Sequence, residues 1–224
     1  MGRLKEKRRG ERLDRQQFRP LAGPVEPVLG ASRMGVVNLL IAKRGYKRYL
    51  EIGCQFNAAF DSISADVKVG VDPVSGGTHR MTSDEFFAQL SGCEAFDVIF
   101  IDGDHRHPQV LRDIENALEH LALGGAIVMH DCLPMSAEYE SPNLSGTAWR
   151  AFAKYRERGD LDAIVGDFDH GVGIIRVAPN PSAVELPCGV DELTYEHLIE
   201  HRDAWMRPTD LAGVEAFVDA WPDP

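Results

Sequence analysis

Two uninterrupted apolar runs flank a helical segment in the middle of the chain. The runs are Val98–Ile101 and Ala126–Met129. Neither run alternates with polar residues, so both are predicted to be strands buried on both faces of a parallel sheet. Between them, apolar residues recur at helical spacing from Val110 to Leu121, and Gly124-Gly125 is predicted to end this helix. The pattern indicates a βαβ unit.

Similar patterns predict the elements on either side of this unit. Ser32 is expected to cap a first helix, and Ser83 or Asp84 to cap a later one. The further helices are expected over 34–44, 57–63, 83–90 and 147–158, and the further strands over 48–53, 67–71 and, as a short one, 79–81.

The last part of the chain changes character. Strands are predicted at Ala163–Val165 and Val172–Val177. The connection Asp167–Gly171 is too short for a parallel crossover, so these two strands should form an antiparallel hairpin. The tail over 193–221 is expected to form two short helices broken at Pro208.

Length and charge limit the possible functions. A chain of 224 residues that is 44% hydrophobic can form one α/β domain with additions at its ends. The net charge of -11 argues against nucleic acid as the main partner. Residues 1–20 are instead basic. They belong to a predicted arm and linker over 1–30, which precedes a main domain over 31–180 and a helical extension over 181–224.

The compartment follows from what the sequence lacks. No apolar core follows the basic start, as a signal peptide would require, and no apolar run approaches the roughly 20 residues of a membrane span. The four cysteines show no CxxC spacing and are expected to be reduced thiols of a cytoplasmic protein.

One end of the predicted sheet has the features of a nucleotide site. The first core strand ends at Gly53, which allows close approach of a ligand, and Asp72 follows the second strand. This spacing matches the roughly 20 residues at which an acid binds ribose hydroxyls, although a plain turn acid before Pro73 is an open alternative. The second and third glycines of GxGxxG are absent after Gly53. A ligand with ribose but no pyrophosphate therefore fits better.

Acids and histidines follow the two strands of the central unit. Asp102 and His105 come after the first, and His130 and Asp131 after the second, so all four should meet at one rim. Oxygen ligands suit a hard divalent cation, whereas the histidine tilts the preference toward Mn²⁺, Fe²⁺ or Zn²⁺, and a rim without metal stays open. His105 could accept a proton near neutral pH, or could simply bond a neighbouring carboxylate at the helix entry.

These motifs together resemble class I S-adenosylmethionine-dependent methyltransferases, in particular the catechol O-methyltransferase branch and its relatives that modify sugars and natural products. The resemblance covers roughly residues 32–178. It implies a Rossmann-like three-layer α/β sandwich with a mostly parallel seven-stranded sheet and a terminal antiparallel hairpin. The residues that carry it are Leu50-Glu51-Ile52-Gly53, Val69-Gly70-Val71-Asp72-Pro73, Phe96 to His105, and Gly124 to Asp131.

The resemblance also implies roles for individual residues. Asp102 and His105 would be catalytic, and Asp102, His130 and Asp131 would hold a metal, Mg²⁺ or Mn²⁺. The chain departs from the family at Gln55 and Asn57, where glycines are usual. The residues expected around the cofactor are Glu51, Gly53, Cys54, Gln55, Asn57, Asp72, Pro73, Ser83, Asp84 and Asp102.

The function expected from the resemblance is O-methylation of a small molecule, such as a sugar or a specialised metabolite, by an enzyme that could be a homodimer. Tyr139, Trp149 and Trp205 are candidate acceptor contacts, although aromatic residues more often belong to the core. Three alternatives stay open: an NAD(P)-dependent Rossmann oxidoreductase, a non-catalytic S-adenosylmethionine-binding module, and a metal-dependent hydrolase or hydroxylase.

Overall fold

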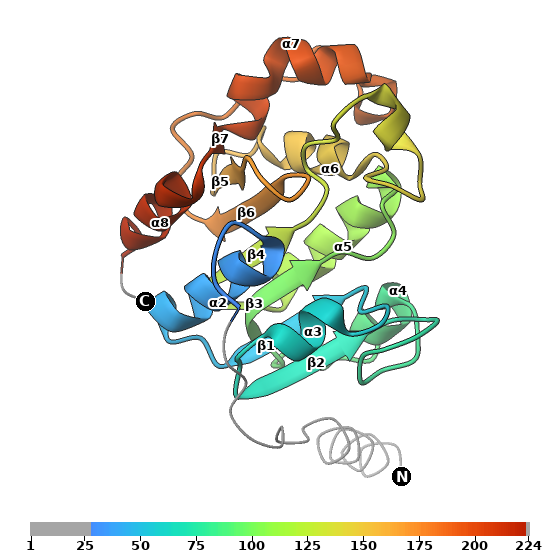
Figure 1. The fold of residues 1–224 in the computed structure, drawn as a ribbon, viewed down its shortest axis with the longest axis vertical. Helices are drawn as coiled ribbons and strands as arrows, with labels where there is room; N and C mark the ends of the chain where they lie inside the picture. Colours follow the sequence, from blue (N-terminus) through green and yellow to red (C-terminus); the bar gives the residue numbers. More distant parts are fainter. Residues whose placement is uncertain (1–27, 223–224) are drawn as a thin grey trace.

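The computed structural model describes residues 28–222, in which helices cover both faces of a central sheet (Figure 1). The strands are β1 (Arg48–Ile52), β2 (Val67–Val71), β3 (Phe96–Ile101), β4 (Leu121–Met129), β5 (Leu161–Gly166), β6 (Val172–Val177) and β7 (Pro208–Thr209). The helices are α2 (Arg33–Arg44), α3 (Ala58–Ser62), α4 (Ser83–Phe87), α5 (His107–Glu119), α6 (Ala148–Tyr155), α7 (Tyr195–Met206) and α8 (Leu211–Asp219), with short 3-10 turns η1 (Ala137–Glu140) and η2 (Val190–Glu192).

Seven strands form one sheet in the order β2-β1-β3-β4-β6-β5-β7. β1 pairs in parallel with β2 and β3, and β3 pairs in parallel with β4. β6 runs antiparallel to both β4 and β5. The short turn Asp167–Gly171 connects β5 to β6. The predicted Rossmann-like fold and its terminal antiparallel hairpin are confirmed.

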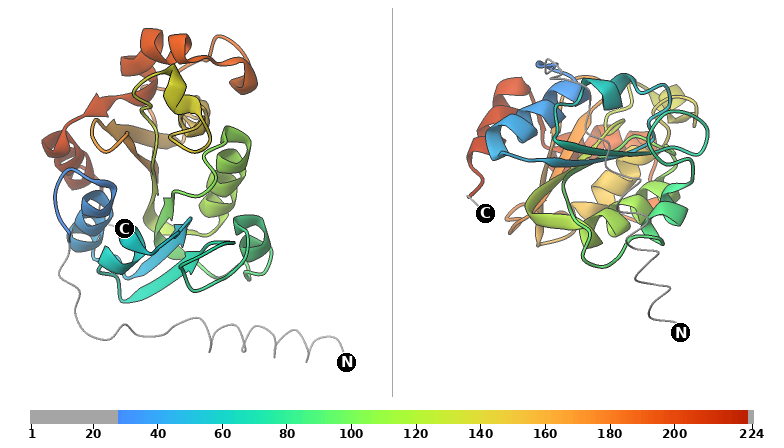
Figure 2. Two further views of the ribbon diagram at one scale, coloured as in Figure 1. Left: turned by 45° about the vertical axis from the view of Figure 1, so that its right-hand side comes forward. Right: turned by 90° about the horizontal axis from the view of Figure 1, so that it is seen from below.

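Alternate residues of β3 show how the sheet separates two cores. Val98 and Phe100 pack in the core beneath α2, α3 and α8, whereas Ile99 and Ile101 pack in the core beneath α4, α5, α6 and α7. Successive side chains of a strand point to opposite faces, so an unbroken apolar run is what a strand covered on both sides requires. The view from below in Figure 2 shows these helical layers on the two faces of the sheet.

The helix after β3 ends earlier than the sequence predicts. α5 stops at Glu119 and β4 begins at Leu121, so Gly124-Gly125 lie inside the strand and do not end the helix. Leu121 is drawn into the sheet because it pairs with Phe96, and the β3–β4 register then shifts. Gly124 has a φ of 74° at this irregular point, a conformation that glycine adopts without strain.

The short strand predicted over 79–81 does not form. Only His79 makes a bridge, an isolated one with Val71. The backbone N–H groups of both Thr78 and His79 donate to the carbonyl of Gly70, at 2.8 and 2.9 Å. The chain therefore folds back in a tight loop after one ladder step, and the seventh strand of the sheet is β7 instead.

Helix α4 is also capped one residue earlier than predicted. The Thr82 hydroxyl accepts a hydrogen bond from the backbone N–H of Glu85, and the Glu85 carboxylate accepts one from the N–H of Thr82. This reciprocal capping box makes Thr82 the N-cap, so Ser83 and Asp84 lie in the first turn, and the helix ends at Phe87 rather than Leu90.

Other helix ends agree more closely with the sequence. Ser32 caps α2 as predicted, because its hydroxyl accepts a hydrogen bond from the N–H of Gly35 at 3.1 Å. α6 is shorter than the predicted 147–158, with Thr147 as its N-cap and Arg156 as its C-cap. The Arg156 side chain is buried and donates to the carbonyl oxygens of Trp205 and Ser182, which draws the chain out of the helix toward the C-terminal segment.

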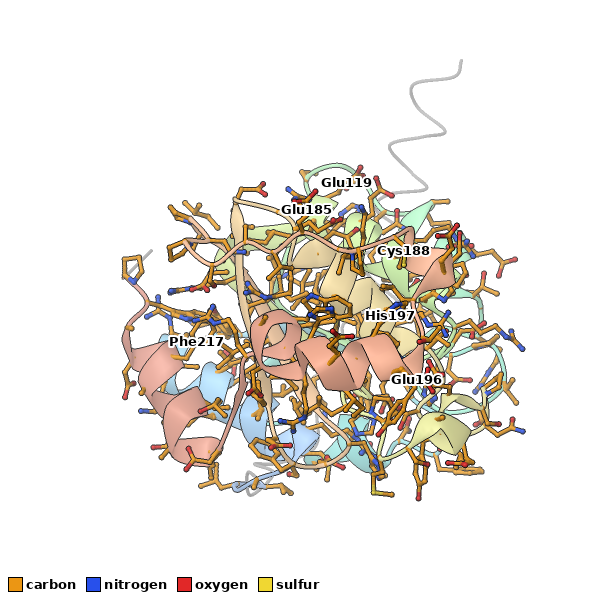
Figure 3. All side chains as sticks on the ribbon, turned by 90° about the horizontal axis from the view of Figure 1, so that it is seen from above. Glu119, Glu185, Cys188, Glu196, His197 and Phe217 are labelled. Atoms are coloured by element: carbon orange, nitrogen blue, oxygen red, sulfur yellow. The ribbon has the colours of Figure 1, made fainter. Side chains whose placement is uncertain are left out.

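The tail forms the two predicted helices and adds an edge strand between them. β7 pairs in parallel with β5, where Pro208 is tolerated because an edge strand needs fewer N–H donors. Figure 3, seen from above, shows α7 crossing this end of the molecule and Phe217 on α8. Val214 and Val218 of α8 are fully buried in the same core as α2. In residues 28–222, no helix combines the length and apolar character needed to cross a membrane.

Gly53 gives the first testable prediction. Its φ is 90°, and a Cβ atom placed on it would fall on the carbonyl of Asp102 and on Gly103. Gly53→Ala should therefore lower the free energy of unfolding by at least about 2 kcal/mol, from backbone strain and overpacking together. Chemical denaturation measures this change. The control is Gly92→Ala, whose Cβ would meet no atom within 4 Å and which should be neutral. An equal effect of the two variants would contradict the prediction.

Candidate active site

An open pocket of about 1090 Å³ lies at the carboxyl ends of β1, β2, β3 and β4. Of the residues predicted to form the site, Asn57 and Asp84 do not line it. Those that do are Glu51, Gly53, Cys54, Gln55, Asp72, Pro73, Ser83, Asp102, His105, His130 and Asp131. Among the described residues, the acids and histidines that follow β3 and β4 thus lie at one rim of the pocket, as expected.

Asp72 organises the loop at one end of the pocket. One carboxylate oxygen accepts the N–H of Gln55 at 2.8 Å, and the other accepts those of Val74 and Ser75 at 2.7 and 2.8 Å. Burial opposes ionisation, but these three N–H groups outweigh it and lower the pKa of Asp72. A carboxylate has about four acceptor positions, so roughly one is left for a ligand hydroxyl.

The loop that lacks the usual glycines is nevertheless tight. Gln55 and Asn57 have φ values of 46° and 65°, in the left-handed region that glycine favours. Asn57 is among the residues that tolerate this conformation, and its side-chain oxygen accepts the N–H of Gly77 at 2.7 Å. Asn57 therefore braces the loop from behind, while Gln55 faces the pocket.

Glu51 and Cys54 form the floor of the same end. Only 1% of Glu51 is exposed, and the Tyr49 hydroxyl donates to its carboxylate. Burial raises the pKa of Glu51 to about 7, and the charge of Asp102 adds to the rise. The Cys54 thiol faces the carbonyl oxygens of Glu51 and Val71 at 3.8 and 3.9 Å, and burial raises its pKa.

A glutamine connects the two residues predicted at the adenine edge. Gln109, from α5, lines the pocket, and its side-chain N–H donates to Ser83 at 3.2 Å and to Asp84 at 3.1 Å. Asp84 is turned away and also lies 3.6 Å from Arg112. Gln109 is thus a pocket residue that the sequence did not point to, because its position on the helix face depends on how α5 packs against α4.

Two carboxylates and His105 meet at the opposite end of the pocket. Asp102, His105 and Asp131 each offer one ligand atom within 4.8 Å of the others. The two ring nitrogens of His105 lie 3.5 Å from Asp102 Oδ1 and 3.5 Å from Asp131 Oδ2. His105 Nδ1 also contacts the carbonyl of Leu144. Asp131 has a φ of 61°, a strained conformation of the kind found at functional sites.

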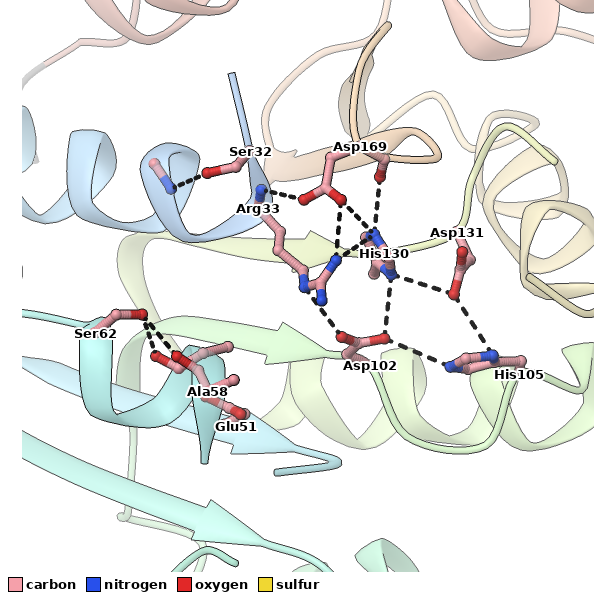
Figure 4. Close-up of polar contacts among 12 residues, drawn as sticks. Ser32, Arg33, Glu51, Ala58, Ser62, Asp102, His105, His130, Asp131 and Asp169 are labelled. Atoms are coloured by element: carbon pink, nitrogen blue, oxygen red, sulfur yellow. Dashed lines mark hydrogen bonds and ion pairs between the residues drawn. The ribbon is translucent and has the colours of Figure 1, made fainter. Parts of the chain in front are cut away.

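His130 approaches the same carboxylates from the other side (Figure 4). Its Nδ1 lies 3.3 Å from Asp102 Oδ1 and 3.2 Å from Asp131 Oδ2. Its Nε2 lies 2.8 Å from the backbone carbonyl of Asp169. A carbonyl oxygen can only accept, so Nε2 carries a hydrogen and Nδ1 is the nitrogen turned toward the carboxylates.

The electrostatics of this cluster require positive charge between the carboxylates. Burial lowers the pKa of His130, but Asp102, Asp131 and Asp169 outweigh burial and raise it to about 11. The partners of Asp102 overcome its burial and lower its pKa to about 2, and the hydrogen bond to Asp102 raises the pKa of His105. Without another cation, protons on the histidines therefore balance the carboxylates.

The same atoms fit a divalent cation. Ligands held at about 2.1 Å from an ion are roughly 3.0–3.4 Å apart, by simple octahedral or tetrahedral geometry. His130 Nδ1 stands 3.3 and 3.2 Å from the two carboxylates, and donates its other ring N–H to a carbonyl, as metal-binding histidines do. Donor type and spacing both match, and the histidine nitrogens favour Mn²⁺, Fe²⁺ or Zn²⁺ over Mg²⁺.

Arg33 and Asp169 complete the rim, and neither residue was predicted from the sequence. Arg33 Nε lies 3.5 Å from Asp102 Oδ2, and its Nη1 donates to Asp169 Oδ1 at 3.0 Å. One signal was available for Arg33, because a cation directly after the Ser32 cap opposes the helix dipole. No local pattern placed Asp169 here, since the turn between β5 and β6 reaches the rim only through tertiary packing.

Of the three aromatic residues considered as acceptor contacts, one lines the pocket and two are buried in the core. Tyr139 lines the pocket and stacks against His170, with ring centroids 6.0 Å apart and planes at 24°. Trp149 and Trp205 are buried in the core beneath α6 and α7. The Tyr139–His170 pair is therefore the aromatic wall of the pocket on the side of the rim.

Comparisons with known proteins agree with this fold. A family model described as a methyltransferase domain matches residues 41–132, from the end of α2 to just past β4. The matched segment includes Glu51, Asp72, Asp102 and Asp131. A comparison with curated proteins finds no match.

Several solved structures are similar to this chain at low sequence identity. Rv0187 from MTB, solved with its cofactor, is 16% identical, covers 79% of this chain and 89% of its own, and gives a TM-score of 0.50. An O-methyltransferase from Bacillus cereus in complex with SAH is 17% identical, with coverages of 76% and 88% and a TM-score of 0.47. The O-methyltransferase TomG from Streptomyces achromogenes, in complex with SAM, is 17% identical, with coverages of 64% and 79% and a TM-score of 0.47.

The fold and the family match point the same way. The chain has a Rossmann-like fold, and its residues 41–132 match the family model of a methyltransferase domain. The resemblance to S-adenosylmethionine-dependent methyltransferases that the motifs suggested is thereby confirmed.

Glu51 gives a prediction about stability and pH. Its pKa is about 7 in the folded chain, against about 4.3 in an unfolded one. The folded state therefore binds the extra proton, and its contribution to stability is lost as the pH rises from about 4.3 to 7, by up to about 1.4 kcal/mol per pH unit. Glu51→Gln should remove this slope and be more stable than the wild type above pH 7.

Urea denaturation across this pH range measures the slope. The control is Glu119→Gln, which removes an exposed carboxylate on α5 and should follow the wild type. Parallel pH profiles for Glu51→Gln and the wild type would mean that Glu51 does not hold the proton.

Proposed function

We propose that this chain transfers a methyl group from S-adenosylmethionine to a hydroxyl group of a small molecule, assisted by a divalent cation. One observation supports this most directly. A single pocket has the backbone-held carboxylate of Asp72 at one end and the Asp102–His105–His130–Asp131 rim at the other. The first suits a ribose, and the second suits activation of a hydroxyl.

The cofactor is assigned to the β1–β2 end. Asp72 accepts from a ribose hydroxyl through its remaining acceptor position, and the backbone of Gly53 lines the pocket beside it. Glu51 lies on the floor, where its carboxylate favours the positive charges of the methionine half. Ser83 and Gln109 lie at the edge assigned to the adenine.

The transfer itself is a direct displacement. A hydroxyl oxygen of the acceptor forms a bond to the sulfonium methyl, the carbon–sulfur bond breaks, and its electron pair stays on sulfur as S-adenosylhomocysteine forms. His105 accepts the hydroxyl proton, and Asp102 and Asp131 orient its ring from either side. Alignment of the two substrates in one pocket supplies most of the acceleration.

Asp102, Asp131 and a histidine of the rim would hold the cation. Such an ion lowers the cost of forming an alkoxide near neutral pH. His130 is the predicted third ligand. His105 also offers a ring nitrogen within 4.8 Å of the ligand oxygens of the same two carboxylates.

The rival functions fit less well. A pyrophosphate needs close backbone approach at the glycine turn, and here the N–H of Gln55 is committed to Asp72. A non-catalytic binding module would have no need for a histidine between two carboxylates of the rim. The acceptor is expected to be a sugar or a specialised metabolite, and a homodimer stays a prediction.

Calorimetric titration of the metal-free chain tests the cofactor assignment. We expect micromolar binding of S-adenosylmethionine and S-adenosylhomocysteine, no binding of NADH, and a change in heat when Mn²⁺ or Mg²⁺ is added. Binding of NADH alone would favour an oxidoreductase and overturn the proposal.

Asp72→Asn should weaken S-adenosylmethionine binding by roughly 10-fold to 100-fold. The change removes a charge-assisted acceptor for the ribose and loosens three backbone contacts of the loop. The matched control is Asp66→Asn, an exposed acid just before the same strand, which should bind like the wild type. If both variants bind equally well, Asp72 does not hold the cofactor.

His105→Ala should lower the turnover number by roughly 100-fold or more, because a positioned general base is lost. Transfer of a labelled methyl group to a panel of catechols and simple glycosides measures it. The affinity for S-adenosylmethionine should stay unchanged, since His105 lies at the other end of the pocket. Unchanged turnover in both His105→Ala and Asp102→Asn would exclude this rim from the chemistry.

A further inference from the structure

We infer that Arg33 and Asp169 form a positioning pair, the Arg33–Asp169 clasp, that holds His130 so that its Nδ1 completes the cation site with Asp102 and Asp131. The inference rests on the cation-assisted form of the proposed function. The two residues come from helix α2 and from the turn between β5 and β6, and they meet only at the rim (Figure 4).

The clasp engages both oxygens of one carboxylate. The backbone N–H of Arg33 donates to Asp169 Oδ2 at 2.8 Å, and its guanidinium Nη1 donates to Asp169 Oδ1 at 3.0 Å. Backbone and side chain of one residue thus fix the orientation of Asp169. Asp169 is only 20% exposed at its side chain, so solvent competes weakly for these bonds.

The backbone carbonyl of Asp169 favours the tautomer of His130 that carries its hydrogen on Nε2. It lies 2.8 Å from His130 Nε2, which must donate. Arg33 Nη1, which can only donate, also lies 2.9 Å from this nitrogen and donates to Asp169 Oδ1 at 3.0 Å. In the tautomer with its hydrogen on Nε2, that hydrogen goes to the Asp169 carbonyl. Nδ1 is left to face Asp102 and Asp131, and orienting a ligand through its far nitrogen is how outer residues support metal-binding histidines.

The turn that carries Asp169 needs an external restraint. Asp169, His170 and Gly171 have φ values of 48°, 59° and 88°, and only the third residue is a glycine. Two consecutive non-glycine residues in the left-handed region persist only where surrounding contacts hold them. The ion pair to Arg33 supplies such contacts, so its loss should let the carbonyl move away from His130.

A role in anchoring helix α2 does not explain why an arginine stands at position 33, in the first turn of this helix. A cation in the first turn opposes the helix dipole, whereas Lys43 in the last turn complements it. Lys43 also bonds Asp219 of α8 at 2.8 Å through both carboxylate oxygens. The same helix therefore offers a matched control, an ion pair to a distant segment that lies far from the rim.

Titration of the full chain with Mn²⁺ tests the clasp. Arg33→Ala and Asp169→Asn should each weaken Mn²⁺ binding roughly 10-fold or more, the usual cost of losing a residue that orients a ligand. The double variant should bind Mn²⁺ no more weakly than either single variant, because the two residues act as one unit. Lys43→Ala should stay within about twofold of the wild type.

Two further measurements separate positioning from general damage. S-adenosylmethionine affinity of the metal-free chain should be the same in all variants, which shows that the fold and the far end of the pocket are intact. Arg33→Lys keeps the backbone bond and the charge but not the guanidinium fork, so it should recover part of the Mn²⁺ affinity. It also serves if Arg33→Ala does not fold.

Opposite results would overturn the inference. Wild-type Mn²⁺ affinity in folded Arg33→Ala, or equal weakening by Lys43→Ala, would show that the clasp does not position the site. A wild-type chain that binds S-adenosylmethionine but no Mn²⁺ would overturn the clasp and leave the methyltransferase proposal standing. A chain that binds Mn²⁺ but no adenosyl ligand would overturn that proposal alone, and the variants would still decide on the clasp.

Discussion

Three carboxylates crowd one edge of this sheet, and their charge must be balanced where water has little access. Asp102 and Asp131 end neighbouring strands, and Asp169 comes over from the β5–β6 turn. Ionised groups in such a place persist only with cationic partners. Arg33 and the two histidines, His105 and His130, supply them, and most other features of the rim follow from how these partners are brought in.

The charged residues of the rim come from several elements, so a large part of the chain contributes to it. His105 and His130 come from the same strand ends as the acids, so the parallel sheet itself brings them together. Arg33 needs α2 to lie against β3 and β4, and Asp169 needs the antiparallel hairpin to close beside β4. The terminal hairpin, which could pass for a mere end to the sheet, therefore contributes to the site.

The cofactor end follows a different principle. There the carboxylate of Asp72 is balanced by backbone N–H groups rather than by cations, and it shapes the loop that it belongs to. This arrangement also answers the question raised by the missing glycines. Gln55 and Asn57 adopt the conformations that glycines would, because Asp72 and Gly77 hold them there. The pocket thus joins a backbone-built half and a side-chain-built half.

The sequence by itself determined the features that depend on local periodicity and on strand order. Unbroken apolar runs predicted the buried strands, the short connection predicted the hairpin, and the ends of β3 and β4 predicted the rim at Asp102 and Asp131. The tertiary structure alone decided the end of α5 at Glu119, the edge strand β7, and the meeting of Arg33 with Asp169. Local patterns encode burial and turns, whereas these contacts join segments as far as 136 residues apart, and only the packing of helices and hairpin on the sheet brings them together.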